Sequence, residues 1–150
     1  MNNWQSIWQR IDCLRRSELF AGLAISLLAE VAEGATLQNW KQGRTLWRHG
    51  DPGQELLVVI HGDLEVLLPN PGGGPDVKVR NLGPGATVGE VAVFDNRPRT
   101  ATVIAVKDSF CLCLKADRLR QLLADHPSFN LQFMQTLADR ILEKDRDITR

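Results

Sequence analysis

The stretch GEVAVFDNRPRTATV, residues 89–103, holds two charged side chains, Glu90 and Arg99, within the most strand-like region of the chain. Gly89 lets the backbone approach a neighbour closely, and the apolar residues after Glu90 suffice for one helical turn. Such a turn leaves backbone N–H groups free at its start, where they can bind an anion. Pro98 holds the chain extended before Arg99 and has no N–H to donate. The stretch therefore predicts a site that holds a negative charge.

Arg99 requires a negatively charged partner, because the β-branched residues that follow it predict an inward-facing strand over 100–106, where an unpaired guanidinium is costly. Glu90 is one candidate, and the two side chains would then pair across a loop. The other is a ligand phosphate, held by Arg99 and the backbone N–H groups of 91–92 and 100–101. A carboxylate beside that phosphate needs a hydroxyl donor. Phosphate, hydroxyl and a flat apolar remainder describe a nucleotide.

The charge balance argues against other classes of partner. Lys plus Arg and Asp plus Glu both number 18, so the formal net charge is zero. We expect no nucleic-acid binding by this chain alone and no membrane association, because a neutral chain lacks the electrostatic footprint for DNA or an anionic membrane. Apolar runs such as 56–60 are too short to cross a bilayer, and the N-terminus lacks the apolar core of a signal peptide. The three cysteines form no disulfide framework, and Cys111 and Cys113, two apart on a predicted strand, are expected to be small core residues. A cytoplasmic location is expected.

Hydrophobic periodicity divides the chain into three parts. The pattern is helical from about residue 4 to 33 and ends at Gly34, then alternates with a turn about every ten residues, and becomes helical again from Asp117, with a break at His126-Pro127. This order predicts an α+β fold class: an eight-stranded antiparallel β-barrel or jelly roll flanked by N-terminal helices and two C-terminal helices. We expect one domain over residues 1–150, made of N-terminal helices (1–34), the β part with the segment 88–103 (35–116) and C-terminal helices (117–150).

The segment 88–103 resembles the phosphate-binding cassette of the cyclic nucleotide-binding domain family. That family includes regulatory subunits of cyclic-nucleotide-dependent kinases, gated ion channels and catabolite-activator-type regulators. Its pattern is Gly-Glu, apolar, Ala, apolar, a short variable loop, then Pro-Arg, a small residue, Ala and Thr, which 89–93 and 98–102 match without a gap. Gly50-Asp51 and residues 55–64 are similar to the family's first strand pairs. The likeness covers nearly the whole chain from residue 17.

The resemblance implies the roles of individual residues. Arg99 would hold the cyclic phosphate, and Glu90 would accept a hydrogen bond from the ribose 2′-hydroxyl. Arg140 and Lys144, on the last helix, would cap the base. Thr100 permits cGMP without selecting it, so the implied ligand is cAMP or cGMP. The rest of the implied site is the cassette backbone around Gly89, Val91, Ala92, Thr100 and Ala101.

The resemblance also implies a function. The chain would be a cyclic nucleotide sensor that signals by repositioning its C-terminal helix, with a hinge near residues 125–127 and a possible homodimer through that helix. Two alternatives remain: the effector part of a transcription regulator whose DNA-binding part lies elsewhere, and an interaction module of the same fold that binds no ligand. We expect no enzyme activity, no catalytic residues, no metal site and no cofactor, because the histidines sit at separate turns and no nucleophile–base arrangement is recognisable.

Overall fold

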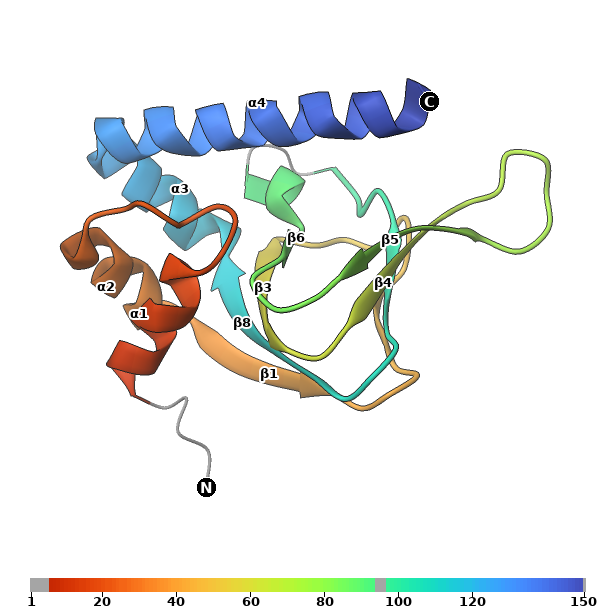
Figure 1. Ribbon diagram of the computed structural model, residues 1–150, viewed down its shortest axis with the longest axis horizontal. Coiled ribbons are helices and arrows are strands. Elements are labelled where there is room, and N and C mark those ends of the chain that lie inside the picture. The colour runs from red at the N-terminus through yellow and green to blue at the C-terminus, as the bar shows by residue number, and fades with distance from the viewer. Residues whose placement is uncertain (1–5, 94–96, 150) are drawn as a thin grey trace.

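The computed structural model describes residues 6–93 and 97–149, without the side chains at 92, 93, 141 and 143–149 (Figure 1). Two helices precede the strands, α1 (Ile7–Arg15) and α2 (Ile25–Glu33), and two follow them, α3 (Ala116–Asp125) and α4 (Pro127–Thr149). One sheet has the strand order β1 (Thr36–Trp40), β8 (Ser109–Lys115), β3 (Glu55–His61) and β6 (Thr87–Val88). The other has the order β2 (Thr45–Trp47), β7 (Thr102–Ala105), β4 (Leu64–Leu68) and β5 (Val77–Leu82).

This architecture confirms the predicted α+β class with its jelly-roll strands and flanking helices. All pairings between the strands are antiparallel. Among the described residues the two sheets share no strand, so they face each other and do not close into a barrel. The predicted helix boundaries at Gly34 and His126 are confirmed, since these residues cap the C-terminal ends of α2 and α3.

The strands β3 and β8 explain why the sequence contains nearly continuous apolar runs. Their sheet is covered on both faces, so side chains of both orientations are buried. Leu56, Val58 and Ile60 of β3 belong to the hydrophobic cluster beneath the helices, whereas Leu57 and Val59 belong to the cluster between the two sheets. Cys111 and Cys113 of β8 lie in this second cluster as free, buried thiols, in agreement with the role expected for them.

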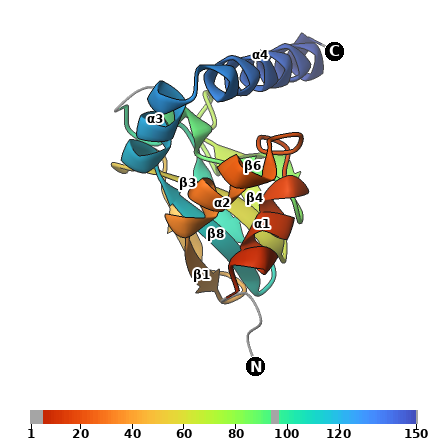
Figure 2. The same ribbon diagram turned by 90° about the vertical axis from the view of Figure 1, so that its left-hand side faces the viewer.

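Helix α4 is attached to the rest of the molecule by a cluster of three phenylalanines. Phe129 and Phe133, on its first turns, contact each other edge to face at 5.8 Å between ring centroids. Phe20, in the loop between α1 and α2, packs against both, at 6.3 and 6.2 Å. Beyond this cluster α4 continues across the top of the molecule in both views (Figures 1 and 2). The packing therefore fixes one end of α4 and directs its middle over the β-strands.

The segment after β6 crosses from one sheet to the other. β6 pairs with β3, and the next strand, β7, pairs with β2 and β4. Between them lies the short 3-10 helix η2 (Glu90–Val93), which Figure 1 shows directly below α4. The helical turn predicted after Gly89 is thus confirmed. The strand predicted over 100–106 is shorter than expected, Thr102–Ala105, so that Arg99 and Thr100 precede it.

Candidate functional site

A cavity of about 720 Å³ lies between the cassette, the β4–β5 hairpin and α4. Its volume is within the range of about 300–1,000 Å³ that is typical of sites for small molecules. The hairpin contributes an apolar wall of Val66, Leu68, Val79 and Leu82, together with Arg80. The opposite walls come from the cassette and from α4, and they carry polar side chains, among them Glu90, Thr100 and Arg140. The cavity is therefore suited to a molecule with one apolar end and one polar end.

Gly89 begins the cassette in a conformation that favours glycine. Its φ is +90°, and a Cβ there would lie 2.6 Å from the Glu55 carbonyl oxygen and 2.8 Å from Arg99 Nη1. Both the backbone conformation and the lack of space exclude a side chain at this position. The predicted close approach of the backbone at Gly89 is thus present. It brings the start of η2 next to the Arg99 guanidinium.

Glu90 is the first residue of η2, and its side chain is only 11% exposed. Its described ionic partner is Arg140 of α4, with Nη2 3.4 Å from Glu90 Oε1. The described contacts include no ion pair between Glu90 and Arg99, so they do not support the alternative in which these two side chains pair across a loop. Glu90 pairs with Arg140 instead, and Arg99 has other neighbours.

Arg99 lies on the other side of Gly89. Its guanidinium stacks on Trp47, with Cζ 3.7 Å from the ring centroid, and Nη1 donates to the Glu55 carbonyl at 3.0 Å. Burial lowers the pKa of Arg99, and the charge of Glu55 is the largest of the influences that oppose this shift. The buried Nε has no hydrogen-bond partner among the described residues. Arg99 thus has donor capacity that no described group satisfies.

The backbone of Arg99 is fixed by the turn that follows β2. Its N–H donates to the Asp51 carbonyl at 2.7 Å, and its own carbonyl accepts from the Gly50 N–H at 2.8 Å. Gly53, in the same turn, has no room for a Cβ because the Arg99 side chain crosses it. The Gly50-Asp51 signal in the sequence therefore marks the segment that holds Arg99 in place.

The structure brings most of the predicted site residues to the cavity. The residues of this set that line it are Gly89, Glu90, Val91, Thr100, Ala101 and Arg140. Arg99 is not among the described lining residues and lies behind Gly89. Ala92 belongs to η2 and Lys144 to α4, but the side chains of both lie outside the described residues. No ligand role of these residues is tested by this geometry, so the assigned roles remain predictions.

Several residues that line the cavity or contact Arg99 were not found from the sequence. Trp47 could have been noticed as an aromatic residue close to the Gly50-Asp51 turn, but no sequence pattern links it to Arg99. The remaining residues of this kind lie far from the cassette in the sequence or at ordinary strand and helix positions, and no motif marks them. These residues are Glu18, Thr87, Thr136 and Asp139.

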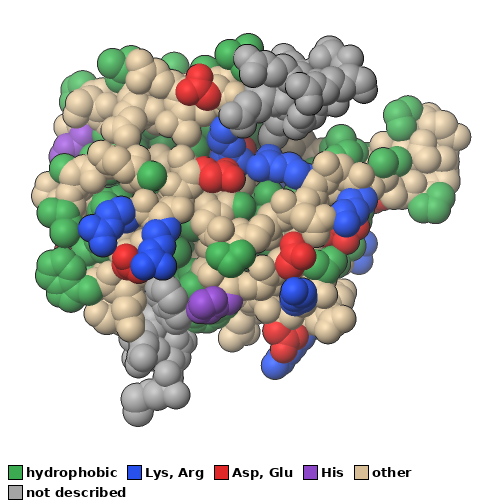
Figure 3. All heavy atoms as spheres, in the orientation of Figure 1, with side chains coloured by type: hydrophobic (Ala, Val, Ile, Leu, Met, Phe, Trp, Pro, Cys, Tyr) green, Lys and Arg blue, Asp and Glu red, His purple; other side chains and the backbone are tan. Residues whose placement is uncertain are grey.

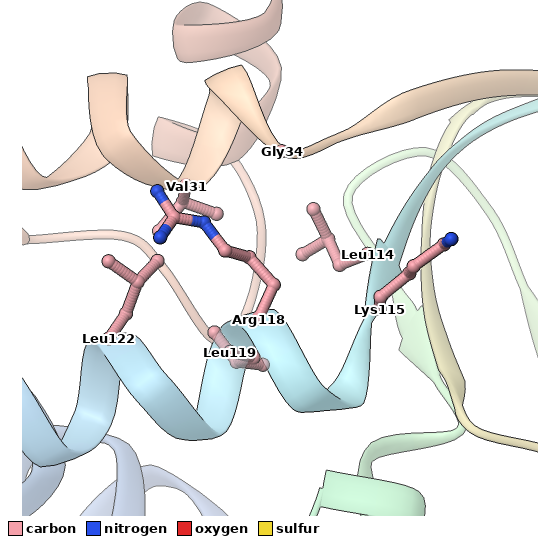
Figure 4. Close-up of a pocket in the computed structure, with 7 residues that line it drawn as sticks. All are labelled: Val31, Gly34, Leu114, Lys115, Arg118, Leu119 and Leu122. Carbon is pink, nitrogen blue, oxygen red and sulfur yellow. The ribbon is translucent and has the colours of Figure 1, made fainter.

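A second, smaller pocket between α2, β8 and α3 is too small for a ligand. Figure 4 shows the Arg118 side chain extending from α3 toward Val31 of α2, with Leu119 and Leu122 also on α3. The space there is about 10 Å³, which is about that of one water molecule. The larger cavity is therefore the candidate site.

Charge and metal-ligand chemistry do not point to another site in the described part of the chain. Figure 3 shows acidic and basic side chains interspersed over the face it presents, with both signs meeting near its centre. The described residues contain no group of three or more His, Cys, Asp and Glu side chains arranged for a metal ion. None of their helices combines the length and the apolarity that a membrane span requires.

Comparison with known sequences agrees with this geometry. The family model described as the cyclic nucleotide-binding domain matches residues 37–126. A CRP-like cAMP-activated global transcriptional regulator of Mycobacterium tuberculosis is 27% identical over 130 residues, which are 87% of this chain and 58% of that protein. This chain thus spans less than two thirds of the curated relatives that it matches most strongly.

Solved structures resemble the chain over most of its length. The N-terminal domain of a transcriptional regulator from Streptomyces coelicolor is 31% identical, with a TM-score of 0.76 over 91% of this chain and 95% of that one. The regulatory domain of Toxoplasma gondii PKA, crystallised with cAMP, is 30% identical, with a TM-score of 0.72 over 81% of this chain and 46% of that one. With its fold, its cassette and the family match over more than half its length, the chain belongs to the cyclic nucleotide-binding domain family.

Proposed function

We propose that this chain, as a single domain over residues 1–150, is a sensor for a purine cyclic nucleotide. The observation that carries the proposal is the cavity of about 720 Å³ that the cassette and α4 line together. A ligand in that position would touch both the recognition segment and the helix that can transmit a signal. Family membership supports the ligand class, because one relative is named as cAMP-activated and another was crystallised with cAMP.

The proposed ligand orientation follows from the walls of the cavity. The apolar hairpin wall suits the base, and Glu90 suits the ribose 2′-hydroxyl because a carboxylate accepts a hydrogen bond from it. The phosphate would lie at the start of η2, beside Gly89 and Val91, and near Thr100 and Ala101. Arg99 would contribute the donor capacity that its Nε retains.

The choice between cAMP and cGMP would depend on the groups beside the base. Thr100 is exposed at the cavity, where its hydroxyl is available to a guanine amino group. Arg140 and Lys144 would cap the base if α4 moved over it, and this role stays a prediction. We propose cAMP as the first ligand to test, because the named relatives that support the proposal bind or respond to cAMP.

The proposed signal is a displacement of α4. Its N-terminal turn follows the corner at residues 125–127, the expected hinge, where His126 Nε2 lies 2.9 Å from Glu30 Oε2 of α2. A ligand shifts such an equilibrium only by its difference in affinity for the two positions of α4. We propose a homodimer through an exposed apolar face of this helix. Its members are Leu131, Met134 and Leu142, whose spacing places them on one side of α4.

Isothermal titration with cAMP and cGMP side by side tests the proposal. The wild-type protein is expected to bind at least one of them, and Arg99→Ala is expected to weaken binding by a hundredfold or more, since loss of a charged partner of this kind costs about 3–5 kcal/mol. Arg44→Ala, at an exposed arginine away from the cavity, is the control and should bind as the wild type does. Unchanged affinity in a folded Arg99→Ala variant would contradict the assigned role of Arg99.

Two further readings remain open to experiment. One is that the chain is the effector part of a transcription regulator, since it is similar to part of proteins named as a transcriptional regulator and a cyclic AMP receptor protein. The alternative of a ligand-free interaction module predicts no binding of either nucleotide in the same titration. We propose no catalytic role, no cofactor and a cytoplasmic location, in keeping with relatives that are regulatory or binding proteins.

A further inference from the structure

Arg140 links α4 to three other segments at the polar end of the cavity. Its Nη1 donates to Thr87 Oγ1 at 2.5 Å and its Nη2 donates to the Thr87 carbonyl at 3.2 Å. The same Nη2 lies 3.4 Å from Glu18 Oε2 and 3.4 Å from Glu90 Oε1. The Arg140 side chain is only 10% exposed although α4 runs across the surface. One guanidinium therefore holds the middle of α4 to β6, to η2 and to the loop after α1.

Glu90 is the partner in this group that also has a proposed role in ligand binding. Its side chain is 11% exposed, so other donors can reach the carboxylate from few directions. Arg140 already lies next to Glu90 Oε1, and both residues line the cavity. A ribose hydroxyl that donates to Oε1 would have to enter the space beside this oxygen that Arg140 Nη2 occupies and would weaken their ion pair.

We infer that Arg140 and the ribose 2′-hydroxyl of the ligand compete for the Glu90 carboxylate, so that recognition of the sugar weakens the attachment of α4. This inference rests on the proposed function and adds the means by which the sugar would act on the helix. When the hydroxyl binds, Arg140 keeps Thr87 and Glu18 but gives up Glu90, and the middle of α4 loses one of its anchors. The role differs from base capping, because the contacts of Arg140 are with the acidic residue of the sugar site.

The competition can be separated from the general electrostatics of the cavity. Arg140 also offsets the negative charges of Glu18, Glu90 and Asp139, so its removal should weaken the binding of any anion. That loss is the same for a cyclic nucleotide with or without its 2′-hydroxyl. The ratio of the two dissociation constants, rather than either constant alone, reports on the competition.

The experiment measures the dissociation constants of cAMP and 2′-deoxy-cAMP by isothermal titration in three proteins, the wild type, Arg140→Gln and Arg80→Gln. If Arg140 lowers the share of molecules in which Glu90 is free for the sugar, its loss should raise the ratio of deoxy to ribo dissociation constants by about fivefold. Arg80→Gln is the matched control, since Arg80 is a half-buried arginine on the opposite wall of the same cavity. It should change both constants by the same factor and leave the ratio as it is in the wild type.

Each outcome decides the inference. An unchanged ratio in Arg140→Gln overturns it, and a smaller ratio would make Arg140 a residue that positions Glu90 for the sugar. If Arg140→Gln does not fold, Arg140→Lys keeps the charge with a shorter reach and should give an intermediate rise in the ratio.

The double variant Glu90→Gln with Arg140→Gln should have the same ratio as Glu90→Gln alone. If the wild-type protein binds neither cAMP nor cGMP, the proposed function falls and this inference with it, whereas the inference alone fails when cAMP binds and the ratio does not respond.

Discussion

The two polar walls of the cavity differ in how the chain builds them. The cassette wall comes from one continuous segment, in which Gly89, Glu90 and Thr100 lie within twelve residues. The α4 wall, with Thr136, Asp139 and Arg140, comes from a helix that is held in place by contacts elsewhere. The described start of the cassette is fixed by the backbone conformation of Gly89, and its later part by the turn that holds Arg99. The α4 wall is fixed by the packing of its first turns and by the contacts of Arg140.

This difference matters for the proposed function, in which ligand binding is converted into movement of α4. A segment that recognises the ligand must keep its geometry. Local backbone constraints achieve this without restricting the motion of other parts of the domain. An output helix must be able to change position, and side-chain contacts over a distance can be exchanged one at a time. The cassette is therefore expected to be the rigid wall and α4 the movable one.

The largest expected effect is the loss of the packing that attaches α4. Phe133→Ala removes a fully buried ring between Phe20 and Phe129 and should lower the free energy of unfolding by about 3–5 kcal/mol. Gln121→Ala, at an exposed position of α3 away from the cavity, should change it by less than about 0.5 kcal/mol. Urea unfolding followed by circular dichroism measures both. Equal losses would mean that α4 is not attached through this cluster.

A somewhat smaller effect is expected when the cassette wall is broken at its first residue. Gly89→Ala combines a φ of +90° with contacts at 2.6 and 2.8 Å, and should cost about 2–4 kcal/mol of unfolding free energy. Gly73→Ala, with a φ of +81° and open space around it, separates the two causes and should cost only about 1–2 kcal/mol. If both variants lose the same stability in urea, crowding at Gly89 is not important.

Alkaline pH should lower the stability of the protein through the buried thiol of Cys113. Cys113 donates a hydrogen bond to Glu55 Oε2, and burial, together with Glu55, raises the pKa of this thiol to about 12. Folded Cys113 keeps its proton above pH 9 while the unfolded thiol loses it, so stability present below pH 9 is lost as the pH rises toward 12, by up to about 1.4 kcal/mol per pH unit.

The comparison of wild type with Cys113→Ala isolates this contribution. The variant should have a lower urea midpoint at pH 7, because a buried side chain is lost, but a smaller decrease between pH 8.5 and about 10.5. Cys111 and Cys13, with pKa values raised by burial to about 12 and about 11, continue to contribute in both proteins. A pH dependence that is identical in the two proteins would contradict the role of Cys113.

The smallest expected effect concerns how Arg99 is supported. Trp47→Leu removes the ring on which the guanidinium stacks, and it should weaken cAMP binding by about two- to fivefold, since an arginine–aromatic contact of this kind contributes about 0.5–1 kcal/mol. Trp8→Leu serves as the control because Trp8 is 67% exposed on α1, and its affinity should stay unchanged. A stronger affinity in Trp47→Leu would mean that the stack withholds Arg99 from the phosphate.

Much of the fold could be predicted because its signals are local. The glycine at 34 and the His126-Pro127 pair end helices through their own backbone preferences, and alternating apolar residues reveal strands whatever lies around them. The closure of the sheets could not be decided in this way. Whether two sheets face each other or join into a barrel depends on pairing between strands that are distant in the sequence. The local hydrophobic pattern does not predict this pairing.

The sequence by itself determined the cassette: the glycine, the glutamate, the helical turn and the arginine follow one another over a few residues, and short-range sterics fix their order in space. Only the tertiary structure decided their partners. It set Arg99 against Trp47 and Glu55, and it brought Arg140 from α4 to Glu90, fifty residues away in the sequence. The physical reason is that a buried charge pairs with whichever opposite charge the folded chain brings within reach, and that depends on packing rather than on sequence spacing.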